Sequence, residues 1–205
     1  MAAPHIYELL AELLEYPAPG LLAVAERCRA QLATRSTDAA EKVDVFAAYA
    51  AGVDVRDLEE LYARTFDLNP AASMDLGFQL FGESYKRGIF LVKMKRAVRA
   101  HDVDAGSELP DHLPVMLRLL ARLTDDEDPR SLVDEVILPT VTKVLEAFGK
   151  TENPYVSLLR AVVSLLCTDF RVDAIQELPH AIEMPFANVP GMNDGKRRLD
   201  VLQEP

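Results

Sequence analysis

The sequence contains little glycine and cysteine and lacks long apolar runs. Nine of its 205 residues are Gly and two are Cys. No segment reaches the roughly 18 consecutive apolar residues of a transmembrane helix. The first five residues, MAAPH, lack the basic start and the uninterrupted apolar run of a signal peptide. We therefore expect a protein of the cytoplasm that does not insert into a membrane.

Motifs for catalysis and metal binding are also missing. The sequence has no G-x-S-x-G, no phosphate-binding glycine loop, no H-E-x-x-H and no Cys/His ligand spacing. Cys28 and Cys167 lie far apart in apolar helical contexts, which predicts buried thiols. His5, His101 and His180 stand singly and are expected at the surface. We expect no catalytic residue, no metal and no cofactor.

Basic residues are outnumbered by acidic ones. There are 22 Lys and Arg against 33 Asp and Glu, which gives a formal net charge of −11 at pH 7. Such a charge disfavours nucleic acid and anionic membranes and favours basic partners, of which a basic peptide is the best suited. Many acidic proteins, however, carry this charge only for solubility.

Alternating strand patterns are absent, and apolar residues recur at helical spacing almost throughout. We predict an all-α, single-domain bundle of about eight or nine helices over residues 1–172, followed by an irregular tail, 173–205. Asp38, with Glu41 three residues on, resembles a capping arrangement for a helix. Pro139 should kink a long helix near Glu135. Asn153-Pro154 opens the last core helix.

The segment Glu108–Pro114 is the most informative motif, because Glu, Asp and His fall within five residues and the Asp and His lie between two prolines. Pro114 is tolerated in the first turn of a helix, which makes Asp111 the natural N-cap. Its carboxylate would then accept from the Leu113 N–H. Capping alone is a sufficient explanation of this pattern, and His112 would then hydrogen-bond locally. The second interpretation is a binding site.

Three stretches together resemble a known family. They are Leu61–Asp67, Leu80–Ser84 with Arg87-Gly88, and Glu108–Pro114. In order and spacing they are similar to the NarJ-type chaperones, or nitrate reductase delta subunit family, within the wider TorD/DmsD group of redox-enzyme maturation proteins. The third stretch is the most specific of the three.

This resemblance implies a dedicated, non-catalytic assembly factor that is helical and cytoplasmic. It implies binding of the N-terminal tail or twin-arginine-type leader of a molybdopterin enzyme's catalytic subunit until the molybdenum cofactor is inserted. The factor would not remain in the finished enzyme. The acidic net charge agrees with a basic leader. These residues do not identify the client enzyme.

The peptide-binding residues that we predict combine the third motif with aromatic residues of the other two stretches: Glu108, Pro110, Asp111, His112, Tyr62, Phe66 and Phe81. Tyr62 and Phe66 also fit an inward-facing stripe and could belong to the core. Arg87 could pair with Glu83 on a helix surface. Two alternatives remain open, a structural subunit retained in a respiratory oxidoreductase complex and a small helical enzyme using Asp111 and His112.

Overall fold

The computed structural model describes residues 5–172 and contains nine helices, with α8 and α9 counted as one, and no β-strand within that range, which confirms the predicted all-α bundle. The helices are α1 (Ile6–Leu13), α2 (Leu21–Leu32), α3 (Thr37–Ala51), α4 (Val55–Tyr62), α5 (Leu76–Phe81), α6 (Tyr85–Ala100), α7 (Leu113–Leu120), α8 (Pro129–Leu132) continuing into α9 (Leu138–Phe148), and α10 (Pro154–Phe170). The predicted tail, 173–205, and His180 lie outside the described residues.

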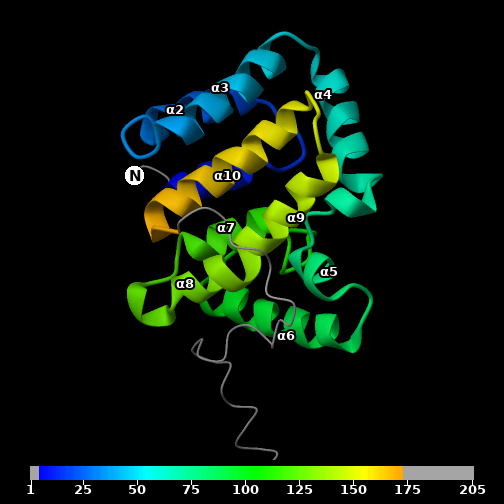
Figure 1. Cartoon of the computed structure of the whole chain (residues 1–205), viewed down its shortest axis with the longest axis vertical. Helices are drawn as coiled ribbons and strands as arrows, with labels where there is room; N and C mark the ends of the chain where they lie inside the picture. The colour runs from blue at the N-terminus through cyan, green and yellow to red at the C-terminus, as the bar shows by residue number, and fades with distance from the viewer. Residues whose placement is uncertain (1–4, 173–205) are drawn as a thin grey trace, which may run out of the picture.

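Two groups of helices stack along the long axis of the molecule (Figure 1). In one group, α3 packs against both α2 and α10, and α1 packs against α2. In the other, α5 contacts α6 and α9. Helix α1 also packs against α7 and so joins the two groups. Three leucines of α1 and the leucine that caps its C-terminus are fully buried: Leu9, Leu10, Leu13 and Leu14. Each stabilises the fold by about 1.5–3 kcal/mol through burial.

The predicted kink at Pro139 coincides with a π-helical turn, Val133–Ile137, which joins α8 to α9. Proline has no N–H to donate to the preceding turn, so the regular helical ladder is interrupted there. The second π turn, Ala63–Asp67, extends α4. Single-turn π segments inside helices are frequent at functional sites, and this one lies in the first of the three family-like stretches.

Two predictions about helix starts have different outcomes. Helix α10 opens at Asn153-Pro154 as predicted, and the Asn153 Oδ1 caps it by accepting a hydrogen bond from the Tyr155 N–H at 3.0 Å. The cap predicted for α3 is wrong: Ser36 occupies that position, and its Oγ accepts from the Ala39 N–H. Asp38 lies in the first turn instead and pairs with Lys42, four residues on. An acidic residue is favoured there by the helix dipole.

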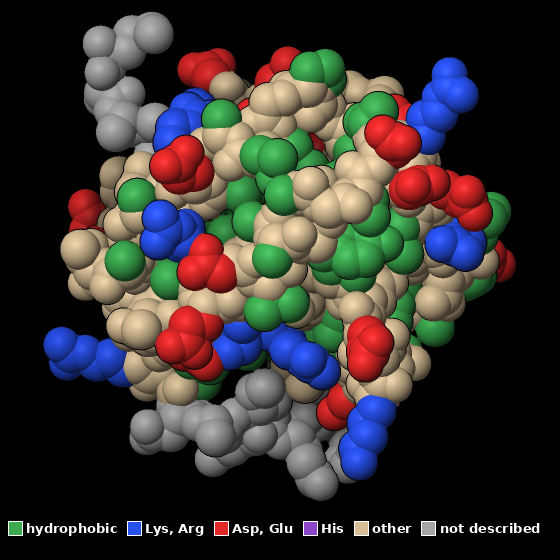
Figure 2. Space-filling model, turned by 90° about the horizontal axis from the view of Figure 1, so that it is seen from above, with side chains coloured by type: hydrophobic (Ala, Val, Ile, Leu, Met, Phe, Trp, Pro, Cys, Tyr) green, Lys and Arg blue, Asp and Glu red, His purple; other side chains and the backbone are tan. Residues whose placement is uncertain are grey.

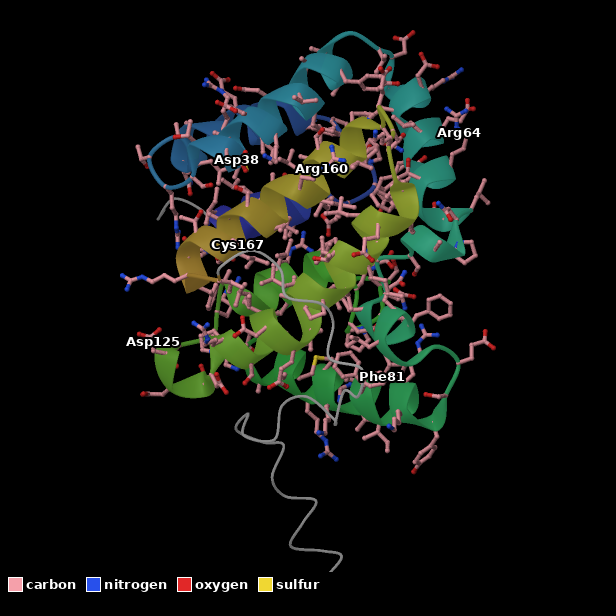
Figure 3. All side chains as sticks on the ribbon, viewed as in Figure 1. Asp38, Arg64, Phe81, Asp125, Arg160 and Cys167 are labelled. Carbon is pink, nitrogen blue, oxygen red and sulfur yellow. The ribbon has the colours of Figure 1, made fainter. Side chains whose placement is uncertain are left out.

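The isolated histidines and cysteines have structural surroundings. His5 is exposed and caps α1, whereas His101 is half-buried and lies 3.2 Å from Glu127. Cys28 is buried, and Cys167 on α10 is half-buried (Figure 3). Among residues 5–172, no helix is long and apolar enough to cross a membrane.

Candidate functional site

The segment before α7 is held by a two-bond backbone bridge to the segment before α5. The Leu113 N–H donates to the Met74 carbonyl at 2.9 Å, and the Leu76 N–H donates to the Asp111 carbonyl at 3.1 Å. The Leu113 N–H is therefore not available to the Asp111 carboxylate. This backbone pairing fixes the directions in which the side chains of both segments point.

Asp111 caps α5 and does not cap α7, so that prediction is wrong. Its Oδ2 accepts from the Gly77 N–H, in the first turn of α5, at 2.8 Å. His112 occupies the N-cap position of α7 without capping it through its side chain. The backbone bridge is the physical reason, because it directs the Asp111 side chain toward the start of the neighbouring helix.

The Asp111 carboxylate is completely buried. Burial raises the pKa of this carboxyl, the Gly77 hydrogen bond lowers it, and the nearby Asp75 raises it further. Its Oδ1 has no hydrogen-bond partner among the described residues. Space around it is tight: a Cβ added at Gly77 would lie 2.6 Å from Oδ2. Asp111 is therefore an internal structural group of the motif.

His112 and Arg87 both turn toward Asp75. The His112 Nδ1 lies 3.3 Å from one carboxylate oxygen of Asp75, and an Arg87 nitrogen lies 3.4 Å from the other. The Arg87 guanidinium also lies over the Phe78 ring, 5.4 Å from its centroid. The pairing of Arg87 with Glu83, which the sequence left open, is not the one formed: Arg87 pairs with Asp75, which also contacts His112, and so links the second and third family-like stretches.

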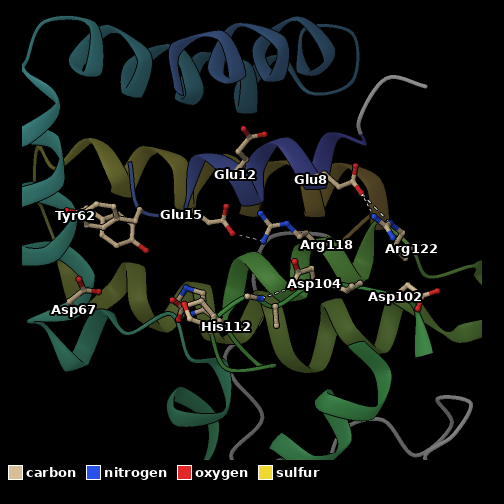
Figure 4. Close-up of a pocket in the computed structure, with 16 residues that line it drawn as sticks. Glu8, Glu12, Glu15, Tyr62, Asp67, Asp102, Asp104, His112, Arg118 and Arg122 are labelled. Atoms are coloured by element: carbon tan, nitrogen blue, oxygen red, sulfur yellow. Dashed lines mark hydrogen bonds and ion pairs between the residues drawn. The ribbon is translucent and has the colours of Figure 1, made fainter. Parts of the chain in front are cut away.

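His112 also reaches a groove of about 790 Å³, which we call the acidic groove (Figure 4). It is lined by Glu8, Glu12, Glu15, Tyr16, Tyr62, Asp67, Asp102, Val103, Asp104, Ala105, Gly106, Ser107, Glu108, His112, Arg118 and Arg122. These residues come from α1 and the segment that follows it, from α4 and its π turn, from the loop after α6, and from α7 with the residues on either side of it. Seven are carboxylates and two are arginines.

Both arginines of the acidic groove are already engaged. Arg118 contacts Glu15 at 2.6 Å, and Arg122 contacts Glu8 at 3.1 Å. The hydrogen bond to Glu15 raises the pKa of Arg118. The other groove carboxylates, apart from Glu12, make no ion pair with any residue of 5–172: Asp67, Asp102, Asp104 and Glu108. The groove therefore carries an excess of negative charge.

Tyr62 lies among these carboxylates. Burial raises the pKa of its hydroxyl, and Asp67, Glu108 and Glu15 raise it further because each disfavours a neighbouring negative charge. The Tyr62 ring also meets Tyr16 edge to face, with 5.5 Å between centroids. This end of the groove combines aromatic surface with negative potential.

The predicted site residues fall into two sets. Tyr62, Glu108 and His112 line the acidic groove together. Phe66, Phe81, Pro110 and Asp111 do not line it. Phe66 is buried and packs against Tyr155, and Phe81 packs against Phe90 near the start of α6. A contact of these two phenylalanines, of Pro110 or of Asp111 with a peptide stays a prediction.

The carboxylates of α1 and of the segment just after it are the residues that sequence reasoning missed. Glu8 and Glu12 have the spacing i, i+4, which places them on one face of α1, and Glu15 follows two residues after the helix ends. The signal was present, but it resembles an ordinary solvated face. Among residues 5–172, no group of His, Cys, Asp and Glu is arranged to hold a metal ion.

Comparison with known proteins identifies the class. Residues 32–158 match the family described as nitrate reductase delta subunit. The chain is 28% identical, over 173 residues, to the nitrate reductase molybdenum cofactor assembly chaperone NarJ of Escherichia coli K12, covering 82% of this chain and 72% of that protein. It is 31% identical, over 127 residues, to the probable NarJ chaperone of Bacillus subtilis, covering 62% and 68%.

The chain therefore belongs to the nitrate reductase delta subunit family. The resemblance of the three stretches is confirmed, and so is the predicted class of chaperone as opposed to enzyme. The alternative of a small helical enzyme using Asp111 and His112 is set aside. The buried position of Asp111 as a cap of α5 gives that residue a structural role in its place.

Proposed function

We propose that this chaperone binds the N-terminal tail or leader of the catalytic subunit of a molybdopterin oxidoreductase in the acidic groove. It holds that segment during insertion of the molybdenum cofactor and assembly, and it does not remain in the finished enzyme. The related chaperones are named for molybdenum cofactor assembly of nitrate reductase. The observation that carries the proposal is the groove's seven carboxylates against two arginines.

The unpaired carboxylates would receive the basic side chains of the segment. Asp67 and Glu108 lie near the Tyr62 hydroxyl, at the aromatic end of the groove. An arginine placed there would form charge-assisted hydrogen bonds and could stack on the Tyr62 ring. Binding of the segment would relieve the repulsion among neighbouring carboxylates, because each basic side chain of the segment brings a compensating positive charge.

The groove also offers apolar contact. Tyr16, Tyr62 and Val103 lie along its wall. An amphipathic segment that places its apolar side on these residues and its basic side on the carboxylates would use both features. The apolar contribution is insensitive to salt, whereas the charge contribution is screened over about 8 Å at physiological ionic strength.

A titration with a synthetic basic peptide from a client's N-terminus tests this. Replacing Asp67→Asn and Glu108→Gln together should raise the Kd about two- to tenfold, because exposed ion pairs are individually weak. The matched control is Glu26→Gln with Glu41→Gln, which removes the same charge from exposed positions on α2 and α3. The control should bind the peptide as the wild type does.

The same titration at rising salt gives a second measurement. The wild-type Kd should rise with salt, and the Asp67→Asn, Glu108→Gln variant should respond less because it has fewer charges to screen. If the groove variant and the control bind the peptide equally and with the same salt dependence, the acidic groove is not the site. Isothermal titration calorimetry measures both quantities on the full chain.

A further inference from the structure

Helix α6 has a composition unlike the rest of this acidic chain. Six of its 16 residues are Lys or Arg, and none is Asp or Glu. It also contains no Ser, Thr, Asn, Gln or His, so its remaining side chains are apolar or are those of Tyr85 and Gly88. A helix of this kind presents cations and hydrocarbon, and almost no neutral hydrogen-bonding group.

One face of α6 belongs to the core. Phe90, Met94, Ala97 and Val98 are buried against the neighbouring helices. The opposite face carries a second apolar stripe that nothing in the described part of the chain covers. Tyr85, Ile89 and Val92 are 86%, 37% and 52% exposed. Their spacing, i, i+4, i+7, aligns them along the helix.

Cations flank the exposed stripe on both sides. At about 100° per residue, Arg96 falls on the stripe itself, Lys86 on one side of it, and Lys95 and Arg99 on the other. All four are exposed: Lys86, Lys95, Arg96 and Arg99. None of them makes an ion pair with a residue of 5–172. Arg87, in contrast, is turned inward to Asp75.

Among residues 5–172, α6 lies across one end of the helical body, and no other described element covers its outer face (Figure 1). On the face at the opposite end, acidic and basic side chains are interspersed (Figure 2). The cations of α6 thus form a local cationic face, which the net value of −11 conceals.

We propose that the exposed face of α6, defined by Tyr85, Ile89, Val92 and the flanking cations, docks on the anionic headgroups of a membrane surface. Clustered Lys and Arg beside a shallow apolar stripe are the recognition chemistry of such a surface. The side chains of this face offer many N–H donors and, apart from the Tyr85 hydroxyl, no acceptor, which suits a surface dense in anionic oxygens such as lipid headgroups. This proposal is independent of the peptide groove.

The overall negative charge of the chain does not prevent this contact. Charges farther than about 8 Å from the lipid surface are screened at physiological ionic strength. Each Lys or Arg close to an anionic surface contributes about 1 kcal/mol, or about fivefold in the partition coefficient. The four exposed cations are therefore sufficient for reversible binding, while three apolar residues are too few for insertion.

Flotation with lipid vesicles tests the proposal on the full chain. Vesicles of phosphatidylcholine and phosphatidylglycerol in equal amounts should carry the wild-type protein upward, and vesicles of phosphatidylcholine alone should not. Arg96→Gln with Arg99→Gln should reduce the partition coefficient on the order of 25-fold, since two cations are removed. The matched control is Arg56→Gln with Arg160→Gln, which removes the same charge from exposed positions on α4 and α10.

A spectroscopic readout uses the absence of tryptophan from the chain. Tyr85→Trp introduces a single indole at the exposed end of the stripe, and its emission should shift to the blue with the anionic vesicles only. Absence of flotation and of the shift would overturn the proposal and leave α6 as a face for an acidic protein. Equal binding of the α6 variant and the control would overturn it too. Loss of peptide binding in the groove variant should leave flotation unchanged, which separates the two proposals.

Discussion

Replacing Gly77→Ala should destabilise the protein through Asp111 and Phe90. The new Cβ would lie 2.6 Å from the Asp111 Oδ2 and 2.8 Å from the Phe90 Cδ1. Both distances are far below van der Waals contact, and both neighbours are completely buried. The carboxylate would have to leave the Gly77 N–H, which is its hydrogen-bond donor at 2.8 Å.

Three contributions decide the magnitude. Overpacking a tight site costs about 1–3 kcal/mol, and loss of a capping hydrogen bond costs about 1 kcal/mol. Alanine recovers up to about 1 kcal/mol over glycine in a helix. The free energy of unfolding should therefore fall by about 2 kcal/mol, which corresponds to a Tm about 4–8 °C lower for a chain of this size.

Gly88→Ala on α6 is the matched control. Nothing lies within 4 Å of a Cβ at that position, so the same substitution should leave stability unchanged or raise it by up to about 1 kcal/mol. Urea unfolding followed by far-ultraviolet circular dichroism measures both variants. In the Gly77→Ala, Asp111→Ala double variant the two effects should be less than additive, because removing the carboxylate removes one clash. A Gly77→Ala protein as stable as Gly88→Ala would refute the reasoning.

Three further predictions concern Asp111, the cysteines and the tail. Burial raises the pKa of Asp111, so its contribution to stability falls as pH rises from its unfolded value of about 3.9 through the raised native value. Asp111→Asn, which keeps an acceptor for the α5 cap, should gain stability relative to wild type across that window; parallel urea titrations at several pH values would contradict this if the difference stayed constant. Asp111→Ala, which leaves a buried N–H unpaired, should cost about 1–3 kcal/mol at pH values below that window, and less as the pH rises through it. Burial raises the pKa of Cys28 to about 12, so iodoacetamide should alkylate Cys167 first, and mass spectrometry that finds Cys28 labelled first would argue against its burial in solution. From the sequence alone, deletion of residues 174–205 should leave the helical core folded, with a small loss of Tm at most; a truncated chain without helical circular dichroism would mean that the apolar pieces of that segment are needed by the core.

Helical periodicity predicted most of the elements because it reports burial within a single segment. The run Ile6, Leu9, Leu10, Leu13 and Leu14 became the fully buried face of α1, apart from 2% exposure at Ile6. Interruptions of a helix were predicted where a proline lacks the N–H that the helical ladder needs, as at Pro139. Several polar residues near a helix start can serve as its N-cap, and local sequence does not decide between them. At α3 the N-cap is Ser36 and not the expected Asp38.

Two things could not be obtained from the sequence. The partner of Asp111 is Gly77, 34 residues away, and a capping rule considers only neighbours along the chain. The acidic groove likewise joins α1, the end of α4 and the loop after α6. Glu15, Asp67 and Glu108 become neighbours around Tyr62 only when these segments pack together.

The sequence by itself thus determined the helical class, the family and the acidic charge, since these depend on composition, period and local motif. The tertiary structure alone decided that Asp111 is a buried cap while Glu108 and His112 face a groove. It also decided that the cations of α6 gather on an exposed face. The physical reason is that hydrogen-bond partners, burial and local electrostatic potential depend on segments distant in sequence, whose approach is fixed by packing of the core.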